Sequence, residues 1–226
     1  MTPPVLGYVL AGGESSRMQR SDLPADKALL VFGGKTLLQR ALATLGEVCS
    51  ETAVLCGTAE RCLRLQSDRR TVPDRVPGMG PVGGLDAALQ DAAERGASWV
   101  LLVPVDLPWM SAAVLQEFLH HGFASGAAAA CMRDGGFVQP LPALVSVAAQ
   151  PIVRDALSAD HRKLLPLLRE IAQQSRGVTE LCVVEAEQLA AASGKTFRNV
   201  NTPEDLLAAQ QDETSGYRLH QSKHGG

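Results

Sequence analysis

The sequence predicts an α/β fold in which a parallel or mixed β-sheet is covered by helices on both faces. Short apolar runs, typical of buried strands, alternate along the chain with segments whose apolar residues recur at helical spacing. Runs that are apolar throughout favour parallel strands, because both faces of such strands are buried. The chain has 226 residues, of which 46% are hydrophobic and 20% are charged. This length and composition indicate one globular domain.

The first half of the chain contains two predicted strands and two predicted helices. In chain order they are a strand at 5–10, a helix at 37–45, a strand at 52–56 and a helix at 85–92. Gly12 and Gly13 predict a turn after the first strand. Thr36 is a favourable N-cap for the first helix, and Gly46 and Gly96 end the two helices.

The second half continues the alternation. It contains a strand at 99–105, a helix at 111–121, a strand at 127–132, an extended segment at 137–146, a helix at 162–174 and a strand at 181–185. A last helix opens at Thr202-Pro203-Glu204-Asp205, which combines an N-cap, a proline in the first turn and two acids. We expect residues 1–211 to form a single domain and the polar segment 212–226 to be a flexible tail.

Charge and cysteine usage exclude several classes of function. The net charge is −3 and the isoelectric point is near 6.0, so no global positive field draws in nucleic acid or a membrane surface. The five cysteines are odd in number and contain no C-x-x-C pair, so we expect neither a disulfide framework nor a thiolate zinc site. A reducing cytoplasm fits best. No segment has the length of a membrane span or the pattern of a signal peptide.

Residues that directly follow strands are the candidates for chemistry, because ligands of open α/β sheets bind at the carboxyl ends of the strands. After the first strand, Gly12 and Gly13 allow successive N–H groups to point at one anion, such as a triphosphate. The alternative is an ordinary glycine turn. Arg17 and Lys27 favour the phosphate site, because both cations offset phosphate charge, although a lysine at the position of Lys27 is more often simply solvated.

Asp106 follows the apolar strand at 99–105 directly. A carboxylate there is the hard oxygen ligand that Mg²⁺ requires when it bridges nucleotide phosphates. The alternative is an aspartate that caps a helix or turns a loop. Asn199 and Asn201 precede the last helix, where Asn201 is equally explained as a turn residue and Thr202 as an N-cap.

Two glycine motifs resemble nucleotide-binding signatures, and the first is rejected. Gly33-Gly34-Lys35-Thr36 lacks the first glycine of a Walker A loop and has no strand closely before it. Residues 78–83 match G-x-G-x-x-G, with Asp106 at about the spacing of the acid in a dinucleotide fingerprint. Pro81 removes a backbone donor, however, and 71–77 is a poor strand, so we expect a base- or ribose-binding loop.

Taken in order along the chain, five motifs resemble those of the molybdenum cofactor guanylyltransferase family. They are Leu10-Ala11-Gly12-Gly13 with Ser15-Ser16-Arg17-Met18, Asp26-Lys27-Ala28-Leu29-Leu30, Gly33-Gly34-Lys35, Pro77-Gly78 with Gly80-Pro81-Val82-Gly83-Gly84-Leu85, and Asn199 with Asn201-Thr202-Pro203-Glu204-Asp205. The resemblance implies a Rossmann-like three-layer sandwich with a mostly parallel central sheet, of the nucleotide-diphospho-sugar transferase type. It also implies transfer of GMP from GTP to molybdopterin cofactor, with Mg²⁺ as the cofactor and pyrophosphate as the second product.

The resemblance assigns roles to individual residues. It implies catalytic or phosphate-binding roles for Arg17, Lys27 and Asp106, with Asp106 as the ligand of Mg²⁺. It implies contacts to the nucleotide by Leu10, Ala11, Gly12, Gly13, Lys27, Cys56, Asp74 and Asp106 and to the pterin by Gln139, Pro140, Asn199 and Asn201. Enzymes that insert the cofactor and acceptor apo-molybdoenzymes are the implied protein partners.

The sequence departs from the family pattern at two places. Cys56 stands where the family often has an asparagine, and a thiol is a poor hydrogen-bond partner. The segment 19–25 is longer than the usual link before Asp26-Lys27. Three other functions remain open: a cytidylyltransferase or sugar-phosphate nucleotidyltransferase of the same fold, a non-catalytic module that binds GTP and molybdopterin for delivery, and an NAD-dependent oxidoreductase that uses 78–83.

Overall fold

A seven-stranded sheet forms the centre of the molecule, with strand order β5-β4-β1-β6-β8-β7-β9. The computed structural model describes residues 3–12, 26–65, 67–175, 177–201 and 205–208. The strands of the sheet are β1 (Val5–Leu10), β4 (Glu51–Gly57), β5 (Arg70–Pro73), β6 (Trp99–Pro104), β7 (Ala129–Asp134), β8 (Phe137–Ser146) and β9 (Cys182–Glu185). Two short strands, β2 (Val31–Phe32) and β3 (Lys35–Thr36), form a separate hairpin.

The sheet is mostly parallel, as the sequence predicts. β1 pairs in parallel with β4 and β6, β4 with β5, and β7 with β9. β8 is antiparallel to both of its neighbours, β6 and β7, so within this sheet β8 runs against the others. The carboxyl ends of β5, β4, β1 and β6 therefore lie along one edge of the sheet.

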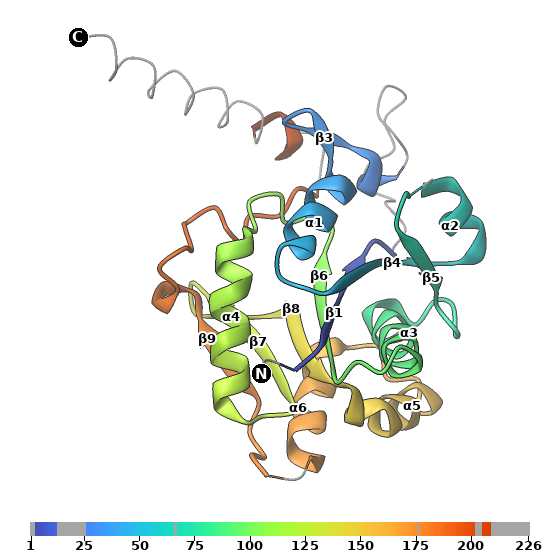
Figure 1. The fold of residues 1–226 in the computed structure, drawn as a ribbon, viewed down its shortest axis with the longest axis vertical. Coiled ribbons are helices and arrows are strands. Elements are labelled where there is room, and N and C mark those ends of the chain that lie inside the picture. Colours follow the sequence, from blue (N-terminus) through green and yellow to red (C-terminus); the bar gives the residue numbers. More distant parts are fainter. Residues whose placement is uncertain (1–2, 13–25, 66, 176, 202–204, 209–226) are drawn as a thin grey trace.

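Helices cover both faces of this sheet (Figure 1). The α-helices are α1 (Leu37–Gly46), α2 (Ala59–Leu65), α3 (Gly80–Glu94), α4 (Ala112–Ser125), α5 (Gln150–Ser158) and α6 (Leu164–Gln174). Short 3₁₀ helices are η2 (Lys27–Leu29), η3 (Val147–Ala149) and η4 (Ala186–Gln188). The three-layer sandwich is confirmed: α1 and α4 pack on one face, and α3, α5 and α6 on the other.

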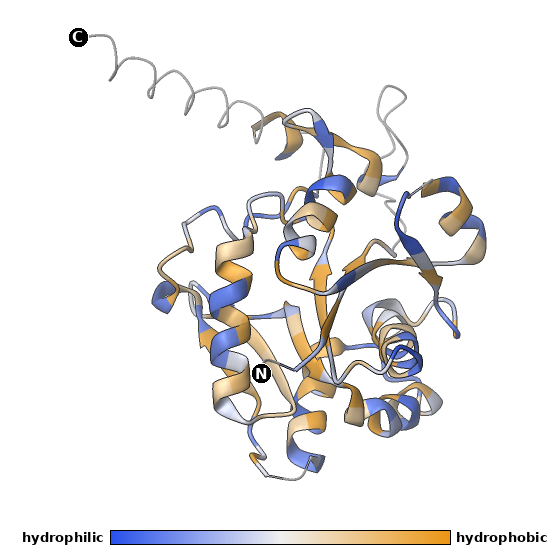
Figure 2. Ribbon diagram, in the orientation of Figure 1, coloured by the Kyte–Doolittle hydropathy of each residue, from blue (hydrophilic) through white to orange (hydrophobic). Residues whose placement is uncertain are grey.

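The sheet separates two hydrophobic cores, and the side chains of β1 point alternately into each. Val5 and Val9 point into the core beneath α1 and α4, whereas Leu6 and Tyr8 point into the core beneath α3. All four are buried, which explains why this strand is apolar throughout. In Figure 2 the central strands are largely hydrophobic, and the helices are hydrophobic only in part.

Residues at the ends of the helices form the expected kinds of cap. Thr36 and Gln39 form a reciprocal capping box at α1, with bonds of 3.1 and 2.9 Å. Ser111 accepts a bond from the backbone of Val114 at the start of α4, and Gly126 ends that helix with a φ of 69°. Residues 205–208 of the predicted last helix are helical, while its opening residues and the tail 212–226 lie outside the described residues.

Two expectations about 71–83 are wrong. The segment 71–77, which we expected to be a poor strand, overlaps β5. Its proline, Pro73, is tolerated because β5 is an edge strand. The expected loop at 78–83 is largely helical, because α3 begins at Gly80 and Pro81 suits the first turn of a helix. Among the described helices, none is long and apolar enough to cross a membrane.

Candidate active site

The ends of four parallel strands meet at one edge of the sheet. Gly12 follows β1, Gly57 ends β4, Asp74 follows β5 and Asp106 follows β6. Backbone bonds continue beyond the strands: the N–H of Ala11 donates to the carbonyl of Leu55 at 3.0 Å, and that of Asp74 to Gly57 at 2.9 Å. Gly12 and Asp106 therefore lie at the same end of neighbouring strands, where ligands of such sheets bind.

Glycines stand where β1 and β4 end. A Cβ atom on Gly12 would lie 3.4 Å from the backbone nitrogen of Gly57, so the two segments pass in van der Waals contact. Gly57 has a φ of 78°, which favours glycine. Leu10 and Ala11 precede this contact on the same strand end. Gly13 and Arg17, the other predicted parts of the phosphate loop, lie outside the described residues.

Lys27, Asp106 and Asn201 come together although the sequence separates them widely. The Nζ atom of Lys27 donates to Asp106 Oδ2 at 2.8 Å and to Asn201 Oδ1 at 2.6 Å. The side chains of Lys27 and Asp106 are 15% and 23% exposed. The N–H of Val200 donates to the carbonyl of Asp106 at 3.0 Å and so holds the segment that carries Asn201 against the end of β6. Lys27, Asp106 and Asn201, all named from the sequence, thus share one site.

The donor set at Asp106 fits Mg²⁺ held jointly with a nucleotide. Among the described residues there is no cluster of three or more His, Cys, Asp or Glu side chains that would form a complete protein cage. Mg²⁺ is often bound by only one or two carboxylates together with substrate phosphates and waters. Asp106 supplies one partly exposed carboxylate, and Lys27 neutralises it.

Asp26 and Arg61 are parts of the site that the sequence analysis missed. Arg61 Nε and Nη2 donate to the two oxygens of Asp26, each at 2.7 Å. Asp26 is also the N-cap of η2 and accepts from the N–H of Ala28 at 3.0 Å. The resemblance contained Asp26 as the neighbour of Lys27, but α2 was not predicted, so no signal marked Arg61 as its partner.

Asp74 and Asp86 form an acidic pair at the other end of the site. Burial, with the negative charge of Asp86, raises the pKa of Asp74 from 3.8 to about 6. Asp86 lies on α3 and is 1% exposed, and its Oδ1 atom has no hydrogen-bond partner in the described part of the chain. Its other oxygen lies 3.5 Å from Arg75 Nη1. Asp86 was not predicted, because an aspartate gives no signal that its position lies on the buried face of a helix.

The start of α3 packs tightly against this acid and against β1. A Cβ atom on Gly83 would lie 3.0 Å from Asp74 Oδ2, and one on Gly84 would lie 2.4 Å from Leu10 Cδ1. The two glycines therefore bring α3 close to the predicted nucleotide residues Leu10 and Asp74. The dinucleotide fingerprint is not supported, because Asp106 follows β6, which is not adjacent to β5 in the sheet.

The predicted pterin residues lie on two segments. Gln139 and Pro140 lie in the first half of β8, beyond Ala143, the last residue that pairs with β6. Because β8 is antiparallel to β6, this places them toward the Asp106 end of the sheet. Asn199 is two residues before Asn201, which contacts Lys27. The structure thus brings Asn201 into the cluster and places the other three residues on neighbouring segments.

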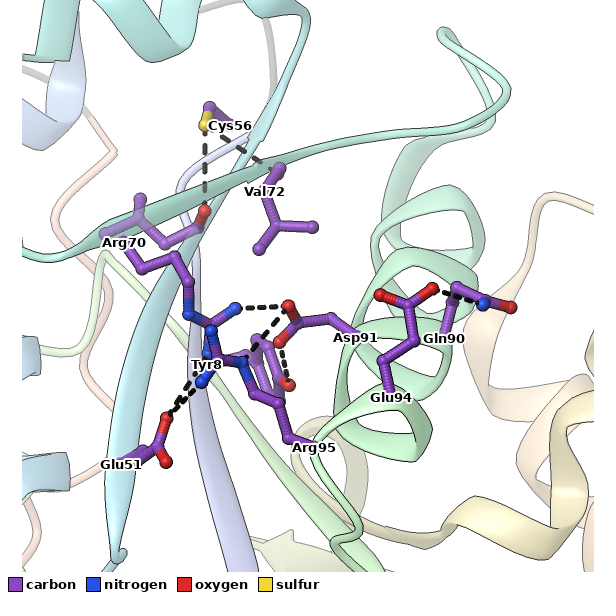
Figure 3. A network of polar contacts seen from close by, with 10 residues as sticks. Tyr8, Glu51, Cys56, Arg70, Val72, Gln90, Asp91, Glu94 and Arg95 are labelled. Atoms are coloured by element: carbon purple, nitrogen blue, oxygen red, sulfur yellow. Dashed lines mark hydrogen bonds and ion pairs between the residues drawn. The ribbon is translucent and has the colours of Figure 1, made fainter.

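Cys56 corrects the expectation that the chain has no disulfide. Its sulfur is bonded to Cys62, with the two Cα atoms 5.3 Å apart. Spacing alone gave no signal, because the turn from β4 into α2 is what brings the two residues together. Cys56 is fully buried, and its sulfur lies 3.7 Å from the carbonyl of Val72 (Figure 3). A disulfide sulfur carries no proton, so this contact is not a hydrogen bond.

A second polar network surrounds Tyr8 and Asp91 (Figure 3). The hydroxyl of Tyr8 and the guanidinium of Arg70 both donate to Asp91, and Arg95 pairs with Glu51. Burial, with the bond to Asp91, raises the pKa of Tyr8, so this hydroxyl stays protonated. The network joins β1, β5 and the second half of α3 and has a structural role.

The fold and the polar cluster at the end of the sheet define an α/β protein of the nucleotidyltransferase class. The structure of molybdopterin-guanine dinucleotide biosynthesis protein A from Archaeoglobus fulgidus has a TM-score of 0.74 at 22% identity, covering 93% of this chain and 99% of that one. A 4-diphosphocytidyl-2C-methyl-D-erythritol synthase from Anaerococcus prevotii has a TM-score of 0.67 at 13% identity, covering 94% and 97%. At these identities the likeness shows the fold.

Similarity in sequence shows the family. The model of the MobA-like NTP transferase domain matches residues 7–192. A probable molybdenum cofactor guanylyltransferase from Opitutus terrae is 33% identical over 199 residues, which are 88% of this chain and 91% of the relative. Another from Rhodopirellula baltica is 34% identical over 210 residues, or 90% of each chain. The chain belongs to the molybdenum cofactor guanylyltransferase family, as the motifs of the sequence predict.

Proposed function

We propose that this chain transfers GMP from GTP to molybdopterin cofactor and releases pyrophosphate, with residues 1–211 acting as one nucleotidyltransferase domain. Its family membership supports the guanylyl transfer. The observation that carries the assignment of the site is the contact of Lys27 Nζ with Asp106 Oδ2 at 2.8 Å, at the carboxyl end of the parallel strands. The reaction belongs in the cytoplasm, with Mg²⁺ as the metal.

The terminal phosphate of the pterin substrate attacks the α-phosphorus of GTP. A new P–O bond forms there, the bond to the bridging oxygen of the β-phosphate breaks, and pyrophosphate leaves with that electron pair. Catalysis of such a transfer consists mainly of alignment and charge neutralisation. Mg²⁺, when bound, neutralises phosphate charge beside Asp106. Lys27 exchanges its contact with Asp106 for phosphate oxygens, and Arg17 and the glycine turn at Gly12-Gly13 bind the same phosphates.

The acceptor side of the site is assigned to Gln139, Pro140, Asn199 and Asn201. Asn201 bonds to Lys27 at 2.6 Å and therefore links the acceptor side to the phosphate side. The nucleotide side is assigned to Leu10, Ala11, Cys56 and Asp74. Enzymes that insert the finished cofactor, and the apo-molybdoenzymes that receive it, are the proposed partners.

The test is release of pyrophosphate from GTP in the presence of molybdopterin cofactor and Mg²⁺. Asp106→Asn removes the charge that holds the metal and should lower the rate by about 10²–10³-fold or more. Asp155→Asn, at an exposed position on α5, is the matched control and should keep the wild-type rate. A full rate in Asp106→Asn would refute the metal site. Binding of GTP and pterin with no turnover in the wild type would instead indicate a delivery module.

A further inference from the structure

Arg61 is buried in a manner unusual for a charged residue. It lies on α2 and is 9% exposed, and arginine is rarely this buried without a partner. Its partner is Asp26, which accepts one bond on each oxygen at 2.7 Å. Such a bidentate ion pair fixes both the distance and the orientation of the carboxylate, which a single hydrogen bond would not do.

The carboxylate that Arg61 holds is the one that begins η2. Asp26 Oδ1 accepts from the N–H of Ala28 and thus shapes the turn in which Lys27 stands. Lys27 in turn reaches Asp106 and Asn201. A continuous series of bonds therefore runs from α2 through Asp26 to the ammonium group at the end of β6.

Arg61 is itself anchored to the end of β4. Its N–H donates to Thr58 Oγ1 at 3.3 Å, and the next residue, Cys62, is bonded to Cys56. The Nη1 atom of Arg61 is buried and has no hydrogen-bond partner among the described residues. A buried donor without a partner is unfavourable, so the pair with Asp26 is not the arrangement that would satisfy every donor of this guanidinium.

We propose that Arg61 is a positioning residue for nucleotidyl transfer, acting through Asp26 on Lys27. The guanidinium fixes the turn at η2, and it also neutralises Asp26. Without Arg61, the carboxylate of Asp26 would compete for the ammonium of the neighbouring Lys27 and draw it from Asp106 and the phosphates. This inference rests on the proposed role of Lys27 in the reaction.

The experiment combines substitutions at Arg61 and at Lys27. Arg61→Lys keeps the charge but loses the bidentate geometry. Arg61→Met keeps much of the side-chain bulk but loses the charge. We expect each to lower kcat/KM for GTP by roughly 10–100-fold in the wild-type background and by less than about 2-fold in a Lys27→Ala background, because coupled residues are not additive. Arg64→Lys and Arg64→Met, at an exposed position of α2, are the controls and should leave kcat/KM unchanged in both backgrounds.

The possible results separate this inference from the proposed function. Equal losses for Arg61→Lys in the two backgrounds would show that Arg61 acts only on the fold and would overturn the inference. An unchanged rate in Lys27→Ala alone would instead refute the role of Lys27. If Arg61→Met does not fold, Arg61→Lys and Asp26→Asn provide the same comparison, since Asp26→Asn breaks the same series of bonds and should show the same dependence on Lys27.

Discussion

Lys27 Nζ lies 2.8 Å from Asp106 Oδ2, so a cation on η2 directly neutralises an anion that follows β6. Both groups are only partly exposed, which strengthens their attraction relative to a surface pair. A nucleotide that arrives with a divalent cation offers each of them a new partner of the correct sign. Under the proposed function, both groups exchange this contact for the ligand.

Lys27→Met should remove the charge while keeping much of the side-chain bulk. We expect kcat for pyrophosphate release to fall by about 10²–10³-fold, because a charged donor to the phosphates is lost in the transition state. Steady-state kinetics with GTP and Mg²⁺ measure this loss. Lys35→Met, at an exposed position of the β2–β3 hairpin, is the matched control. A comparable loss in the control would remove the special role of Lys27.

GTP should stabilise the folded protein more than CTP when Mg²⁺ is present. A ligand that binds only the folded state adds about 2.7 kcal/mol at one hundred times its Kd. Thermal unfolding with GTP, CTP or neither measures the difference, and Asp106→Asn should reduce the shift that GTP causes. Equal shifts for the two nucleotides would argue against guanine specificity.

Asp74→Asn should change the pH dependence of stability in a defined window. The pKa of Asp74 rises from 3.8 in the unfolded chain to about 6 in the fold, so the folded state binds this proton more tightly. This contribution is full below the unfolded pKa and is lost as the pH rises through the folded pKa. The difference in melting temperature, variant minus wild type, should therefore increase between about pH 4 and 6 and stay constant above pH 6. Parallel melting curves across this range would contradict the raised pKa.

Gly84→Ala should weaken nucleotide binding in a chain that still folds. The new methyl group would lie 2.4 Å from Leu10 Cδ1, the flexible end of a side chain that can move aside. We expect a stability loss of no more than about 1–3 kcal/mol and a severalfold higher Kd for GTP, because Leu10 is displaced at the predicted nucleotide site. Gly46→Ala, where nothing lies within 4 Å of the new atom, is the control for both measurements. An unchanged Kd in Gly84→Ala would remove Leu10 from the site.

Thiol titration should detect the disulfide between Cys56 and Cys62. Denatured protein that has not been reduced should show three thiols, those of Cys49, Cys131 and Cys182, and reduced protein should show five. Cys62→Ser should then leave four thiols without reduction, since it frees Cys56. Five thiols before reduction would show that the purified chain is in the dithiol form.

The sequence predicted elements whose signals are local and regular. The run at 5–10, the cap at Thr36 and the apolar strand at 99–105 each specify their structure within a few residues, and all three are confirmed. The short helix α2 and the helix α5 were missed, because few of their residues are buried and no long apolar face forms. Tertiary packing, not local propensity, determines these elements.

The candidate site was predictable where residues follow strands. Lys27, Asp106 and Asn201 were each named from the sequence, but their contact depends on bonds across 79 and 174 positions that no local pattern contains. Arg61 could not be found in this way, since its pairing with Asp26 becomes visible only when α2 folds back onto the end of β4. The burial of Asp86 could not be predicted either, because it depends on how α3 packs.

The reversed direction of β8 has a consequence for how this scaffold diversifies. The strand starts at the Gly135-Gly136 turn of its hairpin with β7, so the residues proposed for the acceptor lie near the beginning of a strand and those proposed for the nucleotide lie at the ends of others. Insertions or substitutions in that hairpin can reshape the start of β8 while β1, β4 and β6 keep their register. Under the proposed function, evolution can therefore alter the segments for the two substrates separately.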